Sequence, residues 1–179
     1  MRTRGRLLCR SYLGMPYRWN AIGTTFYQKA ITKFNELTQF TSVTSIPTNA
    51  FRGCPQLVEI SLPAGVTIVG SSAFNLASSL KTINLSSSLK TIGSYAFYLS
   101  GLAQIDLPST TTTIESNAFQ YCYYMKTIIV RATTPPTLGS NALYGVTPTA
   151  IYVPSASVAA YKSASGWSAF ASKIEAIQE

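Results

Sequence analysis

Apolar residues recur along this chain at a nearly constant interval. Five segments align on an Ala-Phe pair, which becomes Ala-Leu in the fifth. The second residues of these pairs are separated by 23, 23, 22 and 24 residues, and they are Phe51, Phe74, Phe97, Phe119 and Leu143. Five positions before each stands another apolar residue: Ile46, Val69, Ile92, Ile114 and Leu138. A period of this length predicts an array of stacked structural repeats.

The residues after each pair predict a short strand. Apolar positions follow at spacings of three and then two, as in Leu57, Ile60 and Leu62. The alternation places the last two side chains on one face of a strand. The later sets are Leu80/Ile83/Leu85, Leu102/Ile105/Leu107, Met125/Ile128/Val130 and, in the fifth copy, Ile151/Val153. Proline cannot donate to a strand ladder, so we expect strands to end at Pro63, Pro108 and Pro154.

The remaining part of each repeat predicts a second extended stretch and a turn. The stretch contains the apolar residue that precedes the Ala-Phe pair. Ser72, Asn117 and Asn141 suit a helix N-cap, so we expect a short helical or 3₁₀ turn that carries the phenylalanine.

Stacking follows from burial, because one such unit cannot cover its own apolar face. The predicted fold is therefore a repeat solenoid of about five repeats of 22–24 residues, with a parallel β-ladder and an interior row of phenylalanines. We divide the chain into a basic arm at 1–33, a solenoid at 34–154 and a helical C-terminal cap at 155–179.

Both ends carry apolar patterns that predict caps. A helix is expected from Ser155 to about Ser163, ended by Gly166, with Trp167, Phe170 and Ile174 completing a lid. At the other end, Tyr27, Ile31, Phe34 and Leu37 recur at helical spacing, which predicts a helix over Thr25–Phe40.

The segment VTSIPTNAFRGCPQLVEISLP, Val43–Pro63, resembles the BspA-like class of leucine-rich repeats. The resemblance covers about residues 34–179 and includes the C-terminal ending IYVPSASVAAYKSASGWSAFASKI. It implies a right-handed solenoid, and it implies a cell-surface or secreted bacterial protein that adheres to host proteins or to other cells. No signal peptide is recognisable, because Arg10 interrupts the apolar run that begins at Leu7.

Charge is concentrated in the arm. The formal net charge is +8, yet the first 33 residues contain seven basic and no acidic side chains. Such an arm can bind nucleic acid or an anionic surface, or it can be a solvated terminus. No run of 18 apolar residues exists, so we expect no membrane-spanning helix.

Composition disfavours an enzyme. The chain contains no histidine, which excludes Ser-His and Cys-His nucleophile pairs. Asp106 is its single aspartate, its five glutamates are scattered, and no glycine-rich phosphate loop occurs. We therefore expect no catalytic site, cofactor, metal or small-molecule substrate.

Two cysteines occupy one repeat position. Cys54 and Cys122 each follow the repeat phenylalanine by three residues, where other copies have Ala77, Ser100 and Val146. They are interpreted as small buried residues. Three coil steps of about 4.8 Å would hold them roughly 14 Å apart, too far for a disulfide. Cys9 is alone on the arm.

The outward positions of the first strand define a candidate binding face. Two columns are expected: Glu59, Thr82, Gln104 and Thr127, and beside them Ser61, Asn84, Asp106, Ile129 and Tyr152. Lys81 and Lys126 flank these columns, and Tyr123 and Tyr124 favour the C-terminal half as the main contact region. An ordinary solvated sheet surface is the alternative.

Three functional hypotheses remain open. The favoured one is a non-enzymatic adhesion module at the bacterial cell surface that recognises a host or bacterial protein or glycan. The second is a structural spacer within a larger surface protein. The third, and least favoured, is nucleic-acid or anionic-surface binding through the basic arm.

Overall fold

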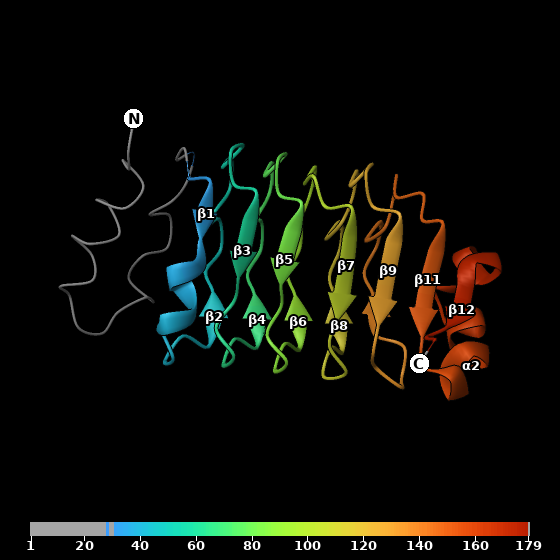
Figure 1. Cartoon of the computed structure of the whole chain (residues 1–179). Coiled ribbons are helices and arrows are strands. Elements are labelled where there is room, and N and C mark those ends of the chain that lie inside the picture. The colour runs from blue at the N-terminus through green and yellow to red at the C-terminus, as the bar shows by residue number, and fades with distance from the viewer. Residues whose placement is uncertain (1–27, 29–30, 179) are drawn as a thin grey trace.

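Each repeat contributes one strand to each of two parallel rows (Figure 1). The computed structural model describes residue 28 and residues 31–178. The first row contains β1 (Lys33–Phe34), β3 (Glu59–Ser61), β5 (Thr82–Asn84), β7 (Gln104–Leu107), β9 (Thr127–Val130) and β11 (Ala150–Val153). The second row contains β2 (Ser45–Ile46), β4 (Ile68–Val69), β6 (Thr91–Ile92), β8 (Thr113–Ile114) and β10 (Thr137–Leu138). The chain alternates between the rows, and this confirms the predicted repeat solenoid.

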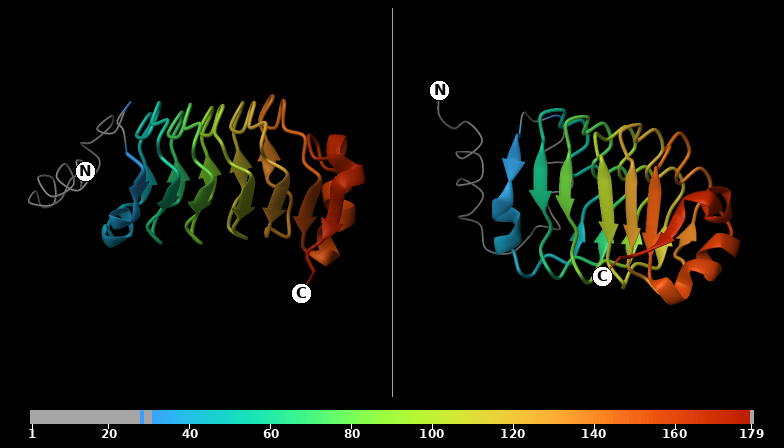
Figure 2. Two further views of the ribbon diagram at one scale, coloured as in Figure 1. Left: turned by 45° about the horizontal axis from the view of Figure 1, so that its top comes forward. Right: turned by 45° about the vertical axis from the view of Figure 1, so that its right-hand side comes forward.

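Equivalent residues of successive repeats lie opposite one another. In the first row Ile60 pairs with Ile83, and in the second row Val69 pairs with both Ile46 and Ile92. Since every pairing is parallel and in the same repeat register, each inward side chain stacks on its counterpart in the next coil. The views in Figure 2 show the coils following one another along one axis.

The repeat phenylalanines form the centre of the core. The rings of Phe51, Phe74, Phe97 and Phe119 stack in sequence, with 5.2 Å between neighbouring centroids and 3° between their planes. No more than 1% of any of these four side chains is exposed. The predicted interior row is confirmed.

The turns that carry these phenylalanines differ from the prediction. They contain no helical or 3₁₀ segment, and left-handed φ angles of 54–78° recur two residues before and two residues after each aligned position. The five pairs are Asn49/Gly53, Ser72/Leu76, Tyr95/Leu99, Asn117/Tyr121 and Asn141/Gly145. The expected N-cap role of Ser72, Asn117 and Asn141 is therefore wrong, because an N-cap residue has extended backbone angles. Asparagine also tolerates the left-handed region, so the residue type does not distinguish an N-cap from a left-handed turn residue.

Hydrogen bonds between coils stabilise this turn. The N–H groups of Asn49, Phe51 and Gly53 donate to the carbonyls of Ser71, Ala73 and Asn75 in the next coil, at 3.0, 2.7 and 2.7 Å. The same pattern repeats in the following three coils. A third line of inter-coil hydrogen bonds therefore runs along the edge where the second row connects to the first.

The first row is interrupted once. Ladder pairing joins β1, β3 and β5, and separately β7, β9, β11 and β12, but in the described chain none joins β5 to β7 although the two are neighbours. In the third repeat Leu102 follows Phe97 at a spacing of five positions, whereas in the second repeat Leu80 follows Phe74 at a spacing of six. We attribute the interruption to this shorter turn, which changes how the chain enters β7.

The N-terminal end is not the predicted helix. Within the described part of Thr25–Phe40, β1 is followed by the 3₁₀ helix η2 (Asn35–Gln39). Lys33 of β1 pairs with Glu59, and the N–H of Gln28 donates to the carbonyl of Arg52 at 2.9 Å. Strand pairing overrides the helical spacing of Ile31, Phe34 and Leu37. Contacts of the array thus begin before residue 34, whereas Tyr27, Cys9 and most of the basic arm lie outside the described residues.

The C-terminal cap forms as expected and adds a strand. The elements are η3 (Ser155–Ser157), α2 (Val158–Ser163), η4 (Ser168–Lys173) and β12 (Ile174–Ala176). Tyr161 and Trp167 are buried edge-to-face with centroids 5.4 Å apart. The Tyr161 hydroxyl donates to the Ala132 carbonyl at 2.7 Å, and the Trp167 indole N–H donates to the Pro136 carbonyl at 2.8 Å. The strand β12, absent from the sequence-based prediction, extends the first row beyond β11.

The two repeat cysteines are buried and unbridged. Cys54 and Cys122 form no disulfide and both have 0% exposure, which confirms their interpretation as small interior residues. The Cys122 thiol donates to the Phe97 carbonyl at 3.0 Å and lies 3.3 Å from the Ser100 hydroxyl oxygen. Burial raises the pKa of Cys122 to about 11, so this thiol is protonated at neutral pH.

Candidate recognition surface

The strand face is the outward side of the first row, formed by the nine predicted residues. Alternation along each strand separates them from the interior, because Ile60, Ile105, Ile128 and Ile151 between them are at most 2% exposed. All nine lie exposed or half-buried on this side: Glu59, Ser61, Thr82, Asn84, Gln104, Asp106, Thr127, Ile129 and Tyr152.

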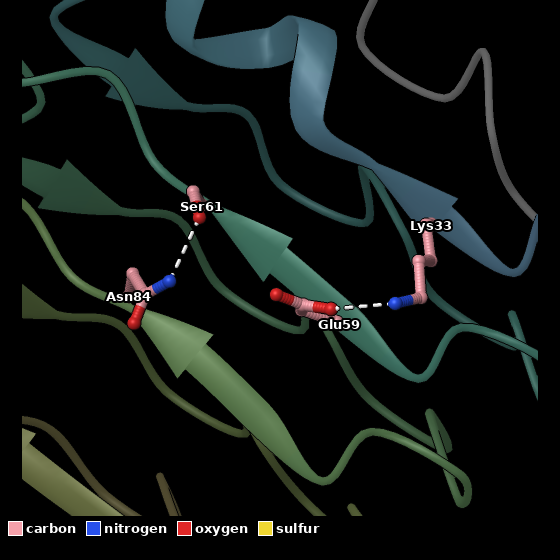
Figure 3. A network of polar contacts seen from close by, with 4 residues as sticks. All are labelled: Lys33, Glu59, Ser61 and Asn84. Carbon is pink, nitrogen blue, oxygen red and sulfur yellow. Dashed lines mark hydrogen bonds and ion pairs between the residues drawn. The ribbon is translucent and has the colours of Figure 1, made fainter.

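Polar side chains satisfy one another in the N-terminal half of the strand face. Ser61 pairs in register with Asn84, whose side-chain amide donates to the Ser61 hydroxyl oxygen at 2.9 Å (Figure 3). The Lys33 ammonium lies 2.9 Å from the Glu59 carboxylate (Figure 3). Lys33 is a neighbour that the sequence did not indicate, since the predicted solenoid began one residue later.

The C-terminal half combines an ion pair with apolar side chains. Arg131 holds Asp106 through two hydrogen bonds of 2.8 Å, from Nε and from a terminal guanidinium nitrogen. Ile129 pairs in register with Asp106 on one side and with Tyr152 on the other. Ionic and apolar surface therefore lie side by side over β7, β9 and β11.

The ion pairs orient side chains more than they stabilise the fold. Both are exposed, and such pairs contribute about 0–1 kcal/mol. The hydrogen bonds and charge of Asp106 raise the pKa of Arg131 further above its usual range. Among the described residues, no group of three or more His, Cys, Asp or Glu side chains could hold a metal ion.

The structure divides the two predicted columns. Glu59 and Thr82 are ladder partners, and so are Gln104 and Thr127. No such pairing links Thr82 to Gln104 or Asn84 to Asp106 in the described chain, because the interruption lies between them. The strand face thus consists of two adjoining parts.

A second exposed feature was largely missed from the sequence. Five tyrosines gather on the turns between the rows, and we call them the tyrosine cluster: Tyr95, Tyr98, Tyr121, Tyr123 and Tyr144. Four contacts link these rings, with centroid distances of 5.5–5.7 Å. Of the five, the sequence singles out only Tyr123, together with Tyr124. The available signal was repeat position, since Tyr98 and Tyr144 both follow the aligned residue directly.

A shallow depression on the second row is lined by polar groups that already have partners. It measures about 320 Å³ and includes Ser94, Glu115 and Thr137. The Glu115 carboxylate accepts hydrogen bonds from both the N–H and the hydroxyl of Ser94, each at 2.9 Å. This carboxylate therefore fixes the turn in place.

The two parallel rows and the stacked coils define a leucine-rich repeat solenoid. The family model for the BspA type leucine rich repeat region matches residues 20–161 in six copies, and the chain belongs to that family. The Ala-Phe pattern of the sequence indicates five of these copies. The match begins within the segment that was predicted to be an arm, in agreement with the contacts of Gln28 and Lys33.

One solved structure supports the same fold. The crystal structure of the pneumococcal vaccine antigen PcpA is similar with a TM-score of 0.61 and 18% identity, over 86% of this chain and 42% of that one. A leucine-rich repeat protein from Bacteroides ovatus gives 0.45 and 24%, over 69% and 43%. The chain thus spans less than half the length of either protein. No curated protein matches the sequence at a significant level. No helix in the described part of the chain is long and apolar enough to cross a membrane.

Proposed function

We propose that this protein is a non-enzymatic recognition module of a bacterial cell surface, and that its strand face binds a protein or a glycan. Its family membership supports the proposal, because stacked repeats build extended surfaces of the kind that solenoids use for binding. The lack of histidine in the whole sequence supports a role without catalysis.

One observation carries the proposal. Asp106, Ile129 and Tyr152 come from three successive strands, and the parallel register brings them side by side. A partner lying across these strands would touch the ion pair of Asp106 and two apolar side chains together. Apolar anchors beside polar groups are typical of protein interfaces.

The test is a binding screen of the purified chain against arrays of host proteins and glycans. Ile129→Lys places a charge in the C-terminal half of the strand face. Ile68→Lys is the matched control, because Ile68 is 44% exposed on β4 in the second row. We expect Ile129→Lys to abolish ligand binding and Ile68→Lys to retain it. Both variants should have the melting temperature of the original protein.

Two results would contradict this assignment. Ligands that survive Ile129→Lys would place binding elsewhere on the molecule. A chain that captures nothing on either array would instead support the spacer hypothesis. Surface labelling of intact cells of the source organism tests the proposed location, since an internal protein would stay unlabelled.

A further inference from the structure

We propose that the tyrosine cluster is a docking site for a proline-rich peptide in the polyproline II conformation. The proposal rests on the binding function above and adds a partner class at a second place on the molecule. The cluster lies on the turns, at the edge where each coil passes from the second row to the first.

Three rings of the cluster are exposed and two, Tyr98 and Tyr121, are half-buried between them. Tyr95, Tyr123 and Tyr144 are 42%, 55% and 57% exposed, and Tyr124 beside them is 69% exposed. Six of the eleven tyrosines of the chain thus lie between residues 95 and 144. Contiguous exposed aromatic surface marks an interaction site more often than scattered single residues do, and tyrosine is favoured at such contacts.

The charge of the turns selects a neutral partner. Residues 94–101, 116–124 and 139–147 contain no Asp, Glu, Lys or Arg. One cation and one carboxylate reach these turns from outside, Lys126 at Thr147 and Glu115 at Ser94, and their charges offset each other. Nucleic acids and strongly charged peptides depend on opposite charge for their affinity, so these turns offer them little.

The tyrosine hydroxyls of the cluster favour a ligand that accepts hydrogen bonds. Desolvation, and then the neighbouring tyrosines, raise the pKa of Tyr121, so its hydroxyl keeps its proton and can donate. A polyproline II chain leaves its backbone carbonyls without internal partners, and proline itself has no N–H. Aromatic side chains with free hydroxyls complement both properties, and docking such a chain costs little ordering entropy.

Ring orientation separates this partner from a glycan. Tyr98 and Tyr121 are inclined by 68°, and Tyr121 and Tyr144 by 71°. Of the four contacts in the cluster only Tyr121–Tyr123 is near parallel, at 26°, so the cluster as a whole provides no continuous platform for flat sugar rings. Alternating aromatic orientations are compatible with the ridges of a polyproline II helix.

The spacing of the coils also fits. A polyproline II helix repeats every three residues, or about 9.3 Å. Two coil steps cover about 9.6 Å in a regular strand ladder, and somewhat more along the phenylalanine stack of this protein, where each step is 5.2 Å. Tyr98 and Tyr144 occupy the same repeat position two coils apart. Prolines three residues apart can therefore make equivalent contacts with these two rings.

The experiment uses the whole chain and a capped peptide of about ten prolines, with a Gly-Ser peptide of equal length and maltoheptaose as comparison ligands. Other copies of the repeat supply substitutions that the fold tolerates. Tyr98→Asn introduces the residue found at Asn75, and Tyr144→Gln introduces that found at Gln120. The control Ile68→Ser removes an exposed apolar side chain from the second row and matches Ser45.

We expect calorimetric titration to show saturable binding of the proline peptide, with none for the Gly-Ser peptide or maltoheptaose. The double variant Tyr98→Asn/Tyr144→Gln should bind at least roughly tenfold more weakly, whereas Ile68→Ser should bind normally. Ile129→Lys should also bind the peptide normally, which separates this site from the strand face.

Three results would overturn the inference: no saturable binding of the proline peptide, unchanged affinity in a normally folded double variant, or preferential binding of maltoheptaose. The proposed function would stand in each case if the arrays still yielded ligands sensitive to Ile129→Lys. The proposed function of the strand face would be contradicted, and the inference retained, if the proline peptide bound as expected but the arrays yielded no ligand.

Discussion

At the residue scale, each repeat position is defined by what lies above and below it in the neighbouring coils. Phe97 is stacked between Phe74 and Phe119, with 5.2 Å to each ring centroid. The fifth repeat has Leu143 at this position and still buries it, with 7% exposure. The position thus requires a large apolar side chain and gains most from an aromatic one.

Truncation of Phe97 should therefore be costly. We expect Phe97→Ala to lower the free energy of unfolding by about 3–5 kcal/mol, since it removes buried contacts and leaves a cavity between two rings. Urea denaturation measures this change. Phe97→Leu, which introduces the residue type of the fifth repeat, serves as the control and should lose clearly less. Equal losses for both variants would mean that the aromatic stack contributes nothing specific.

Burial of Cys122 predicts a pH dependence of stability. The pKa of this thiol rises to about 11 in the folded chain from an ordinary value of 9.0. Above the ordinary value the unfolded thiol ionises while the folded thiol keeps its proton. The folded state then binds more protons, and its stability falls as pH rises toward about 11.

The measurement compares the original chain with Cys122→Ala, which matches Ala77 in the second repeat. Unfolding free energies are determined from about pH 8 to about pH 10.5. The original chain should lose more stability over this range, because only it contains the Cys122 thiol. Ionisation of the tyrosines affects both proteins equally and cancels in the comparison. Parallel curves would show that the thiol ionises equally easily in the folded state.

At the scale of elements, the turn of the third repeat leaves no room for a side chain at Gly101. A Cβ on Gly101 would lie 2.2 Å from the carbonyl oxygen of Ser78 in the previous coil. The Gly101 N–H also donates to the Ala77 carbonyl at 3.2 Å. The shorter turn is thus possible because a residue without a side chain passes directly against the neighbouring backbone.

We expect Gly101→Ala to destabilise the protein by about 1–3 kcal/mol or more, because the backbone at residue 101 and the backbone at Ser78 must move apart. Thermal melting is a sufficient measurement. Gly65→Ala is the matched control, since its nearest backbone contact would be 3.3 Å away. If Gly101→Ala melted no lower than this control, the third turn would be more adaptable than the structure indicates.

At the scale of the whole molecule, inter-coil hydrogen bonding is continuous along the turns and the second row but not along the first row. The second row pairs without interruption from β2 to β10, while the first row separates into a group ending at β5 and a group beginning at β7. Because repeat proteins are stabilised mainly by contacts between neighbouring coils, this junction is the weakest in the strand ladder.

Amide hydrogen exchange should reveal the junction. We expect the N–H groups of β7 that face β5 to exchange faster than those joining β7 to β9, because they lack ladder partners in the described chain. Exchange followed residue by residue in NMR spectra gives the comparison. The equivalent groups between β3 and β5 are the internal control, and uniform protection across both junctions would contradict the prediction.

Periodicity in the sequence was sufficient to establish the repeat, the stacking of coils, the identity of the interior residues and the C-terminal cap. It was sufficient because every coil must bury its apolar residues against its neighbours. The sequence pattern therefore predicts the buried environment of the four repeat phenylalanines, of Cys54 and Cys122, and of Trp167. It also predicts the outward orientation of the nine strand-face residues.

Three-dimensional contacts were needed to establish how neighbouring coils fit together in detail. They revealed the left-handed turn at Asn117, the early start of the array at Lys33, the Asp106–Arg131 pair and the ladder break after β5. They also assembled the tyrosine cluster from three turns. Each of these features depends on contacts between residues about 22–26 positions apart, whose geometry changes with a single residue in a turn. The local sequence pattern does not determine the geometry of these contacts between coils, because the same side chains suit more than one backbone conformation.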